Sequence, residues 1–165
     1  MNKETTLHLM CGKMASGKST LANSLAKTND AILIVEDDWL SRLYPGEINT
    51  INDYVKYSIR LQNIITSHVA SLLKQDISVV LDFPANTIKQ RNQLRSIFEL
   101  TGVAHKLHYV EASDEKCKEQ LKTRNQSRPE QVAFTSEHEF DAINTYFQPP
   151  SVNEGLNIIR HLKNA

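Results

Sequence analysis

Eight residues near the start of the chain have the types and spacing that bind a string of phosphate groups. They read G-K-M-A-S-G-K-S and match the pattern G-x-x-x-x-G-K-[ST] in full. Its two glycines let successive backbone N–H groups point inward around an anion, and a helix that begins at the motif's second lysine adds the positive end of its dipole. The predicted nucleotide-binding residues are Gly12, Lys13, Met14, Ala15, Ser16, Gly17, Lys18, Ser19 and Thr20.

Two side chains of this motif have separate chemical roles. Lys18 is a compact cation for the β- and γ-phosphates, and Ser19 offers its hydroxyl to Mg²⁺. A glycine-rich turn with a surface lysine would contain the same residues, but an apolar segment before the motif and a helical pattern after it favour a phosphate loop. The chain lacks the base-specifying N-K-x-D sequence of GTPases. We therefore expect ATP and Mg²⁺ as cofactors. The side chains do not specify whether the nucleobase is adenine or guanine.

Three acidic residues, Glu36, Asp37 and Asp38, directly follow the second apolar segment. The carboxyl ends of parallel strands line the ligand crevice of an α/β sheet. A carboxylate there can accept the proton of a substrate hydroxyl as that hydroxyl attacks the γ-phosphate. One acid could instead cap a short helix over residues 38–43, but a cap does not need three. We expect one of the three to be the general base.

A further acid, Asp82, ends the third apolar segment. It can hold Mg²⁺ through water or position the acceptor, and a turn or cap residue is an equally consistent interpretation. The residues from Phe83 to Asn86 would form a loop over the crevice, and Arg91 lies on the next helical segment. We expect Asp82, Asn86 and Arg91, together with Asp37, to contact the acceptor.

Two arginines stand where a helical segment gives way to a polar loop, Arg124 and Arg128. An arginine placed over the triphosphate neutralises negative charge on the phosphate in the transition state of transfer. This effect increases the rate by about 10³–10⁵. The alternative is favourable charge at a helix C-terminus, which suits Arg124 better because Arg128 lies beyond that last turn. We expect both to be catalytic, on a lid over about residues 124–136.

These residues need a scaffold of alternating strands and helices. Short apolar segments rich in β-branched residues suit a parallel sheet that is covered on both faces. Strand and helix alternation predicts βαβ units and a three-layer α/β fold. The expected strands cover residues 5–11, 31–35, 77–81, 104–110 and 156–159. The expected longer helices cover residues 18–27, 51–74, 87–100, 113–124 and 136–147.

Composition excludes several classes of protein. The chain has 165 residues, a length that predicts one domain over residues 1–165. Its 19 Lys+Arg balance 19 Asp+Glu, and this zero net charge argues against a surface built to bind nucleic acid. No segment approaches the roughly 20 apolar residues of a membrane span. Two cysteines are too few for a disulfide scaffold. A polar N-terminus without a hydrophobic signal core predicts a cytoplasmic location.

Several segments together resemble a known family, the small P-loop kinases. The group includes polynucleotide 5′-kinase, chloramphenicol phosphotransferase and the zeta toxins, and the more similar members are bacterial single-domain proteins described as AAA-type ATP-binding proteins. The resemblance covers nearly the whole chain. It is carried by residues 12–20, by Val35 to Trp39, by Val80 to Asp82 with Asn86 and Arg91, and by Arg124 with Arg128.

The resemblance implies a P-loop NTPase fold with a parallel five-stranded sheet of order 2-3-1-4-5 and a short helical lid. It implies that Asp37 is the general base, that Asp82 is a second acceptor-site aspartate, and that Arg128 is the lid arginine that contacts the phosphates. Leu40 departs from the pattern, because polynucleotide kinase has an arginine three residues after its base. That departure disfavours a nucleic acid with a 3′-phosphate as acceptor.

Three functions are consistent with these residues. The first is ATP-dependent phosphate transfer to a hydroxyl of a small-molecule acceptor, whose identity no residue specifies. The second is a nucleic-acid 5′-end kinase. It would need a face of basic residues, and in this sequence acidic residues are interleaved with the basic ones. The third is an ATP-binding regulatory protein that phosphorylates no acceptor. The sequence predicts no oligomeric state.

Overall fold

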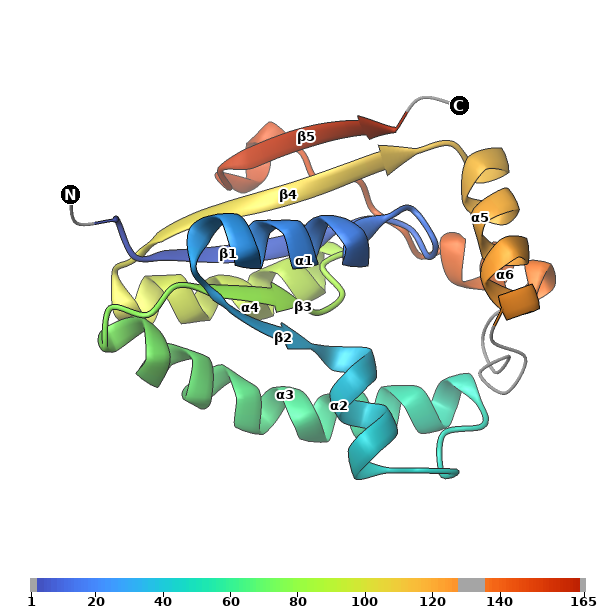
Figure 1. Ribbon diagram of the computed structural model, residues 1–165, viewed down its shortest axis with the longest axis horizontal. Coiled ribbons are helices and arrows are strands. Elements are labelled where there is room, and N and C mark those ends of the chain that lie inside the picture. Colours follow the sequence, from blue (N-terminus) through green and yellow to red (C-terminus); the bar gives the residue numbers. More distant parts are fainter. Residues whose placement is uncertain (1–2, 128–135, 164–165) are drawn as a thin grey trace.

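The computed structural model describes residues 3–127 and 136–163 of the chain. Its centre is a parallel sheet of five strands with the order β2-β3-β1-β4-β5 (Figure 1). This confirms the predicted α/β class and the predicted order 2-3-1-4-5. The strands are β1 (Thr6–Cys11), β2 (Ile32–Val35), β3 (Val79–Asp82), β4 (Ala104–Ala112) and β5 (Ile158–Lys163).

Helices connect the strands and cover both faces of the sheet. In the described part of the chain, no helix has the length and hydropathy needed to cross a membrane. A short 3₁₀ helix, η2 (Val152–Glu154), precedes β5. The α-helices are α1 (Lys18–Asn29), α2 (Glu36–Leu43), α3 (Ile51–Lys74), α4 (Ile88–Thr101), α5 (Asp114–Ser127) and α6 (Glu137–Asn144).

The alternation of side chains along β1 divides the core into two layers. Leu7 and Leu9 belong to the cluster that includes Leu61 of α3, whereas Met10 packs with Ala22 of α1 on the opposite face. Helix α1 therefore covers one face of the sheet, and α3 and α4 cover the other (Figure 1). The carboxyl ends of the strands remain at one edge, where the phosphate loop and the acidic residues lie.

Two elements illustrate how the observed bounds differ from the predicted ones. The strand expected over residues 156–159 is β5, which runs from Ile158 to Lys163. β5 is an edge strand with one neighbour, and it carries exposed polar residues. Its apolar segment therefore covers fewer residues than the segment that pairs with β4. Helix α2 begins at Glu36 immediately after β2, two residues before the expected start at residue 38, so all three acids lie in its first turn.

Three histidines on neighbouring strands form a hydrogen-bonded chain through the sheet. His8 Nδ1 lies 3.0 Å from His108 Nε2, and His108 Nδ1 lies 3.0 Å from His161 Nε2. His8 and His108 are buried. This contact could not be predicted from the sequence, because the three residues are far apart in the chain and no two have the spacing of metal ligands. Among the described residues, no group of three or more potential ligands could hold a metal ion.

Burial lowers the pKa of His8 to about 4 and that of His108 to about 3, and the charge of Lys106 adds to both shifts. The folded protein therefore keeps both rings neutral at a pH where histidines of the unfolded chain, with an ordinary pKa of about 6.5, take up protons. Each proton withheld in this way lowers the free energy of unfolding by about 1.4 kcal/mol per pH unit as the pH falls below 6.5.

We predict that His108→Gln makes the free energy of unfolding less dependent on pH between 6.5 and 5. The change should correspond to about one proton, and urea unfolding monitored by circular dichroism at several pH values measures it. His68→Gln is the matched control, because His68 is exposed on α3 and its loss should leave the dependence unchanged. Equal slopes for His108→Gln and the wild type would contradict a buried neutral pair.

Candidate active site

The phosphate loop is the tight turn between β1 and α1. Gly17, the residue before α1, has a φ of 96°, and Ala15 has a φ of 62°, so two residues lie in the left-handed region. A Cβ atom at Gly12 would lie 2.7 Å from Ser16 Oγ and 3.2 Å from the carbonyl oxygen of Val110. The first glycine is therefore needed for a close approach of chain segments, and the second for its backbone conformation.

A buried hydroxyl lies inside this loop. Ser16 is 1% exposed, and its Oγ has no hydrogen-bond partner among the described residues. Buried polar groups in folded proteins are almost always hydrogen-bonded, so an unpaired one calls for an explanation. A phosphate oxygen held by the loop would provide the missing partner. The loop geometry and this hydroxyl both fit the triphosphate that the motif predicts.

Side chains from the loop meet an acid at the end of β3. Ser19 Oγ donates a hydrogen bond to Asp82 Oδ2 at 3.1 Å, and Lys18 Nζ lies 3.5 Å from Asp82 Oδ1. Asp82 is 5% exposed, and its Oδ1 forms no hydrogen bond to another described residue. Mg²⁺ in phosphate-binding sites takes one or two protein oxygens together with water and phosphate oxygens. The hydroxyl of Ser19 and the carboxylate of Asp82 fit that donor set.

The three acids at the start of α2 have three different environments. Glu36 is buried, and its carboxylate accepts hydrogen bonds from the hydroxyls of Tyr54 and of Ser58, the latter at 2.8 Å. Burial raises the pKa of Glu36, against the effect of these two hydrogen bonds. Both partners lie on α3, one helical turn apart. Glu36 therefore attaches the start of α2 to α3 and is not exposed to an acceptor.

The other two acids are exposed. Asp38 pairs with Arg42 one turn later on the same helix, with 3.2 Å between Asp38 Oδ1 and Arg42 Nε. Asp37 has no hydrogen bond or ion pair to any other residue that the structure describes. Its side chain is exposed in the first turn of α2. Asp37 is thus the one acid of the three that is available for a substrate.

Strand pairing brings Asp37 and Asp82 to the same edge. Val35 of β2 is in register with Asp82 of β3, and α2 begins directly after Val35. The two aspartates therefore lie at the carboxyl ends of adjacent strands, as the sequence predicts. Lys18, which pairs with Asp82, begins α1 after the loop that follows β1, and β1 is the other neighbour of β3.

Asn86 and Arg91 are occupied by contacts within the protein. The Gly12 amide donates to Asn86 Oδ1 at 2.9 Å, which joins the loop after β3 to the phosphate loop. Arg91 is 1% exposed; its Nε donates to Glu154 Oε1 at 2.7 Å and its Nη1 donates to the carbonyl oxygen of Ala85 at 2.9 Å. The expected contact of Arg91 with an acceptor is not consistent with this placement. Its guanidinium holds the Asn86 loop in position instead.

The outer side of the phosphate loop packs against α5 and α6. Lys13 Nζ lies 2.7 Å from Asp114 Oδ1 and 5.4 Å from the centre of the Phe147 ring. Met14 and Ala15 pack against a cluster formed by Cys117, Leu121 and Phe140. These contacts link the loop to the segments on either side of the region predicted as a lid.

The lid arginines are only partly within the described residues. Arg124 lies in the last turn of α5, as expected. Arg128 lies outside the described residues, so its predicted contact with phosphate remains a prediction.

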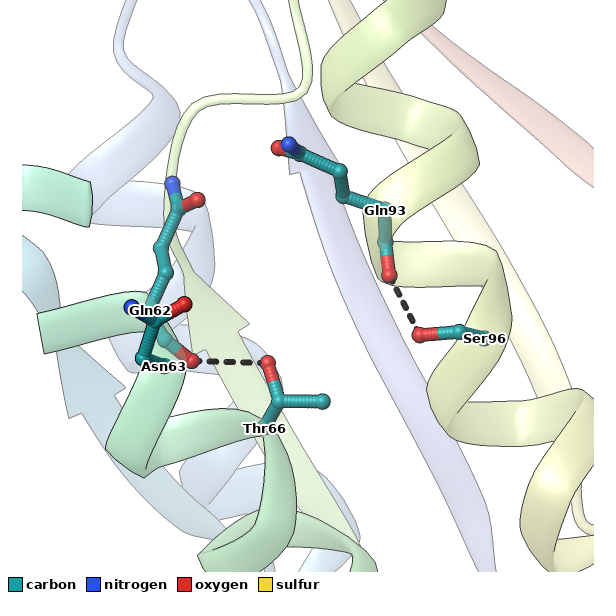
Figure 2. A pocket seen from close by; sticks show the side chains of 5 residues that line it. All are labelled: Gln62, Asn63, Thr66, Gln93 and Ser96. Carbon is teal, nitrogen blue, oxygen red and sulfur yellow. Dashed lines mark hydrogen bonds between the residues drawn. The ribbon is translucent and has the colours of Figure 1, made fainter. Parts of the chain in front are cut away.

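A separate cavity of about 220 Å³ lies between α3 and α4. Figure 2 shows the amide side chains of Gln62 and Gln93 on the two facing helices. The hydroxyls of Thr66 and Ser96 donate hydrogen bonds to backbone carbonyl groups of their own helices (Figure 2). None of its lining residues is charged, belongs to the phosphate loop or follows a strand. The cavity is lined by Gln62, Asn63, Thr66, Gln93 and Ser96.

We predict that Arg91→Met lowers the free energy of unfolding by about 3–5 kcal/mol, because it leaves the Glu154 carboxylate without its buried partner. Urea unfolding measures the change. Arg160→Met is the matched control, since Arg160 forms an exposed pair with Glu111 at 3.7 Å and should cost less than about 1 kcal/mol. Similar losses in the two variants would show that the Arg91 pair has no special structural role.

Known proteins share this architecture. A search of curated proteins found no match. Among solved structures, the chain is similar to the shikimate kinase from Acinetobacter baumannii in complex with shikimate, with 17% identity and a TM-score of 0.65 over 99% of this chain and 86% of that chain. It is similar to the Mycobacterium tuberculosis APS kinase in complex with AMPPNP and APS, with 14% identity and a TM-score of 0.64 over 98% and 90%.

A gluconokinase from Sinorhizobium meliloti 1021 gives 14% identity and a TM-score of 0.57 over 97% of this chain and 83% of that chain. At these identities the likeness is one of fold. A family profile described as AAA domain matches residues 7–150, which is most of the chain. The chain therefore belongs to this AAA domain family and has the fold of P-loop kinases.

Proposed function

We propose that the protein is an ATP-dependent phosphotransferase that moves the γ-phosphate of Mg-ATP to a hydroxyl group of a small-molecule acceptor. The observation that carries this proposal is the combination of the Lys18, Ser19 and Asp82 cluster with the unpaired Asp37 on the adjacent strand end. The first part fits a triphosphate with its metal ion. The second supplies an exposed carboxylate, in the first turn of the helix that follows the neighbouring strand, with which no other described residue pairs.

In the proposed reaction, Asp37 accepts the proton of the acceptor hydroxyl while the hydroxyl oxygen bonds to the γ-phosphorus. The bond between that phosphorus and the β–γ bridging oxygen breaks, and its electrons leave with ADP. Lys18 and the loop amides stabilise the charge on the phosphate oxygens. Ser19, and Asp82 through water, would hold Mg²⁺, which would supply positive charge against the charge of the phosphate chain.

The lid residues complete this proposal. Arg124, and Arg128 beyond the described end of α5, would bring positive charge to the transferred phosphate when the lid lies over the nucleotide. Lys13 would contribute through its position in the loop while it pairs with Asp114. The substrate side would consist of Asp37 and Asp82, with Asn86 acting through its hydrogen bond to the Gly12 amide.

A nucleic-acid 5′-end kinase receives less support from the structure. Several basic residues that could form a binding face are engaged by acids. Arg91 is buried against Glu154, Arg95 lies 3.8 Å from Glu99, and Lys118 lies 3.0 Å from Asp141. A polynucleotide acceptor needs a basic surface that is free to bind backbone phosphates.

The proposal predicts that Asp37→Asn abolishes transfer while leaving the affinity for Mg-ATP unchanged. Loss of a general base lowers the rate by about 10²–10⁴, and asparagine keeps the shape but cannot accept the proton. Transfer is measured with γ-labelled ATP and a cell metabolite extract, and the labelled product identifies the acceptor. ATP affinity is measured by calorimetry.

Asp38→Asn is the control for the Asp37 substitution, because Asp38 is adjacent, exposed and paired with Arg42. It should transfer phosphate at nearly the wild-type rate. Normal transfer by Asp37→Asn would disprove the assignment of the base. An ATP-binding wild type that labels no acceptor, but forms an ATP-dependent complex with another protein, would favour the regulatory alternative.

A further inference from the structure

Lys163, the last residue of β5, lies against the phosphate loop. A Cβ atom at Gly17 would be 2.8 Å from Lys163 Nζ and 2.9 Å from its Cε. The ammonium group is therefore next to the residue that immediately precedes α1. No motif points to this contact, because the two residues are separated by most of the chain.

The face of the sheet explains the direction of this side chain. Lys163 and His161 share one face of β5, because they are two residues apart on a strand. His161 contacts His108, which contacts His8, and His8 shares its face of β1 with Met10. Met10 packs against α1. Lys163 therefore projects on the α1 side of the sheet, toward the first turn of that helix.

Lys163 has no carboxylate partner among the described residues, with which it forms no hydrogen bond or ion pair. Two acids at the carboxyl end of β4 and the start of α5 are paired with other cations: Asp114 pairs with Lys13, and Glu111 with Arg160. The ammonium faces the positive end of the α1 dipole, which by itself repels a cation. A bound anion at the loop would reverse this balance.

Sheet order decides which part of a nucleotide this cation meets. Asp37 follows β2 and Lys163 ends β5, and these strands are the two opposite edges of the sheet. The γ-phosphate must face the acceptor and hence the β2 side. The β5 side of the loop then faces the part of the phosphate chain nearer the nucleoside.

We propose that Lys163 is a further phosphate-binding residue, which contacts the nucleotide at the α- and β-phosphates that ATP and ADP share. The inference rests on the proposed function, both on its nucleotide site and on the placement of the acceptor on the Asp37 side of the sheet. In this arrangement Lys18 and Lys163 approach the phosphate chain from different directions. Lys163 contributes to nucleotide affinity and leaves the rate of the chemical step unchanged.

We expect Lys163→Met to weaken the binding of Mg-ATP and of Mg-ADP by the same factor, about tenfold, because a charge-assisted hydrogen bond is lost. Calorimetry measures both affinities. The binding of adenosine should not change, and kcat at saturating ATP should stay within about twofold of the wild type. Lys163→Arg, which keeps the charge, should retain most of the affinity.

Arg160→Met is the matched control, since it removes the same charge from the same strand at a residue that pairs with Glu111. It should bind ATP as the wild type does. Unchanged ATP affinity in Lys163→Met, or an equal loss in Arg160→Met, would overturn the inference while leaving the proposed function intact. A loss for ATP alone would place Lys163 at the γ-phosphate and also overturn it. A wild type that binds no Mg-ATP would instead refute the proposed function.

Discussion

The close approach of backbone segments between β1 and α1 is the constraint on which the rest of the site depends. A side chain at Gly12 would collide with Ser16 and with the carbonyl of Val110, and the amide of Gly12 is hydrogen-bonded to Asn86. This hydrogen bond joins the phosphate loop to the loop after β3. Arg91, paired with Glu154, donates to the Ala85 carbonyl of that second loop. A buried ion pair away from the phosphate loop thus supports the segment to which that loop is hydrogen-bonded.

The acids show how an α/β sheet separates structural roles from chemical ones within a few residues. Glu36, Asp37 and Asp38 are consecutive, yet their carboxylates meet two hydroxyls on α3, open solvent and a surface arginine respectively. Successive residues in the first turn of a helix point about 100° apart, so neighbours in sequence face different parts of the molecule. This turn starts directly after β2, and its position therefore follows from the pairing of β2 with β3.

Much of this architecture could be predicted from the sequence, because its signals are local. The apolar segments predicted the strands, the phosphate-loop motif predicted a strand–loop–helix unit, and the resemblance supplied a sheet order that the structure confirms. Long-range pairing could not be predicted this way. From the sequence, Arg91 is expected to be a cation near the crevice. In the structure it is neutralised by Glu154, which lies 63 residues later in the chain. The contacts of His8 with His108 and of Gly17 with Lys163 depend equally on which strands become neighbours.

The pair between Arg91 and Glu154 also imposes an order on biosynthesis. Glu154 leaves the ribosome after the phosphate loop, α3 and α4 have been translated, so a nascent chain that ends before it contains the whole loop motif but not the carboxylate that neutralises Arg91. Until then the Arg91 guanidinium is more stable in water, because burying it without a partner costs free energy. The ion pair that supports the segment around Asn86 can therefore form only after Glu154 has been translated.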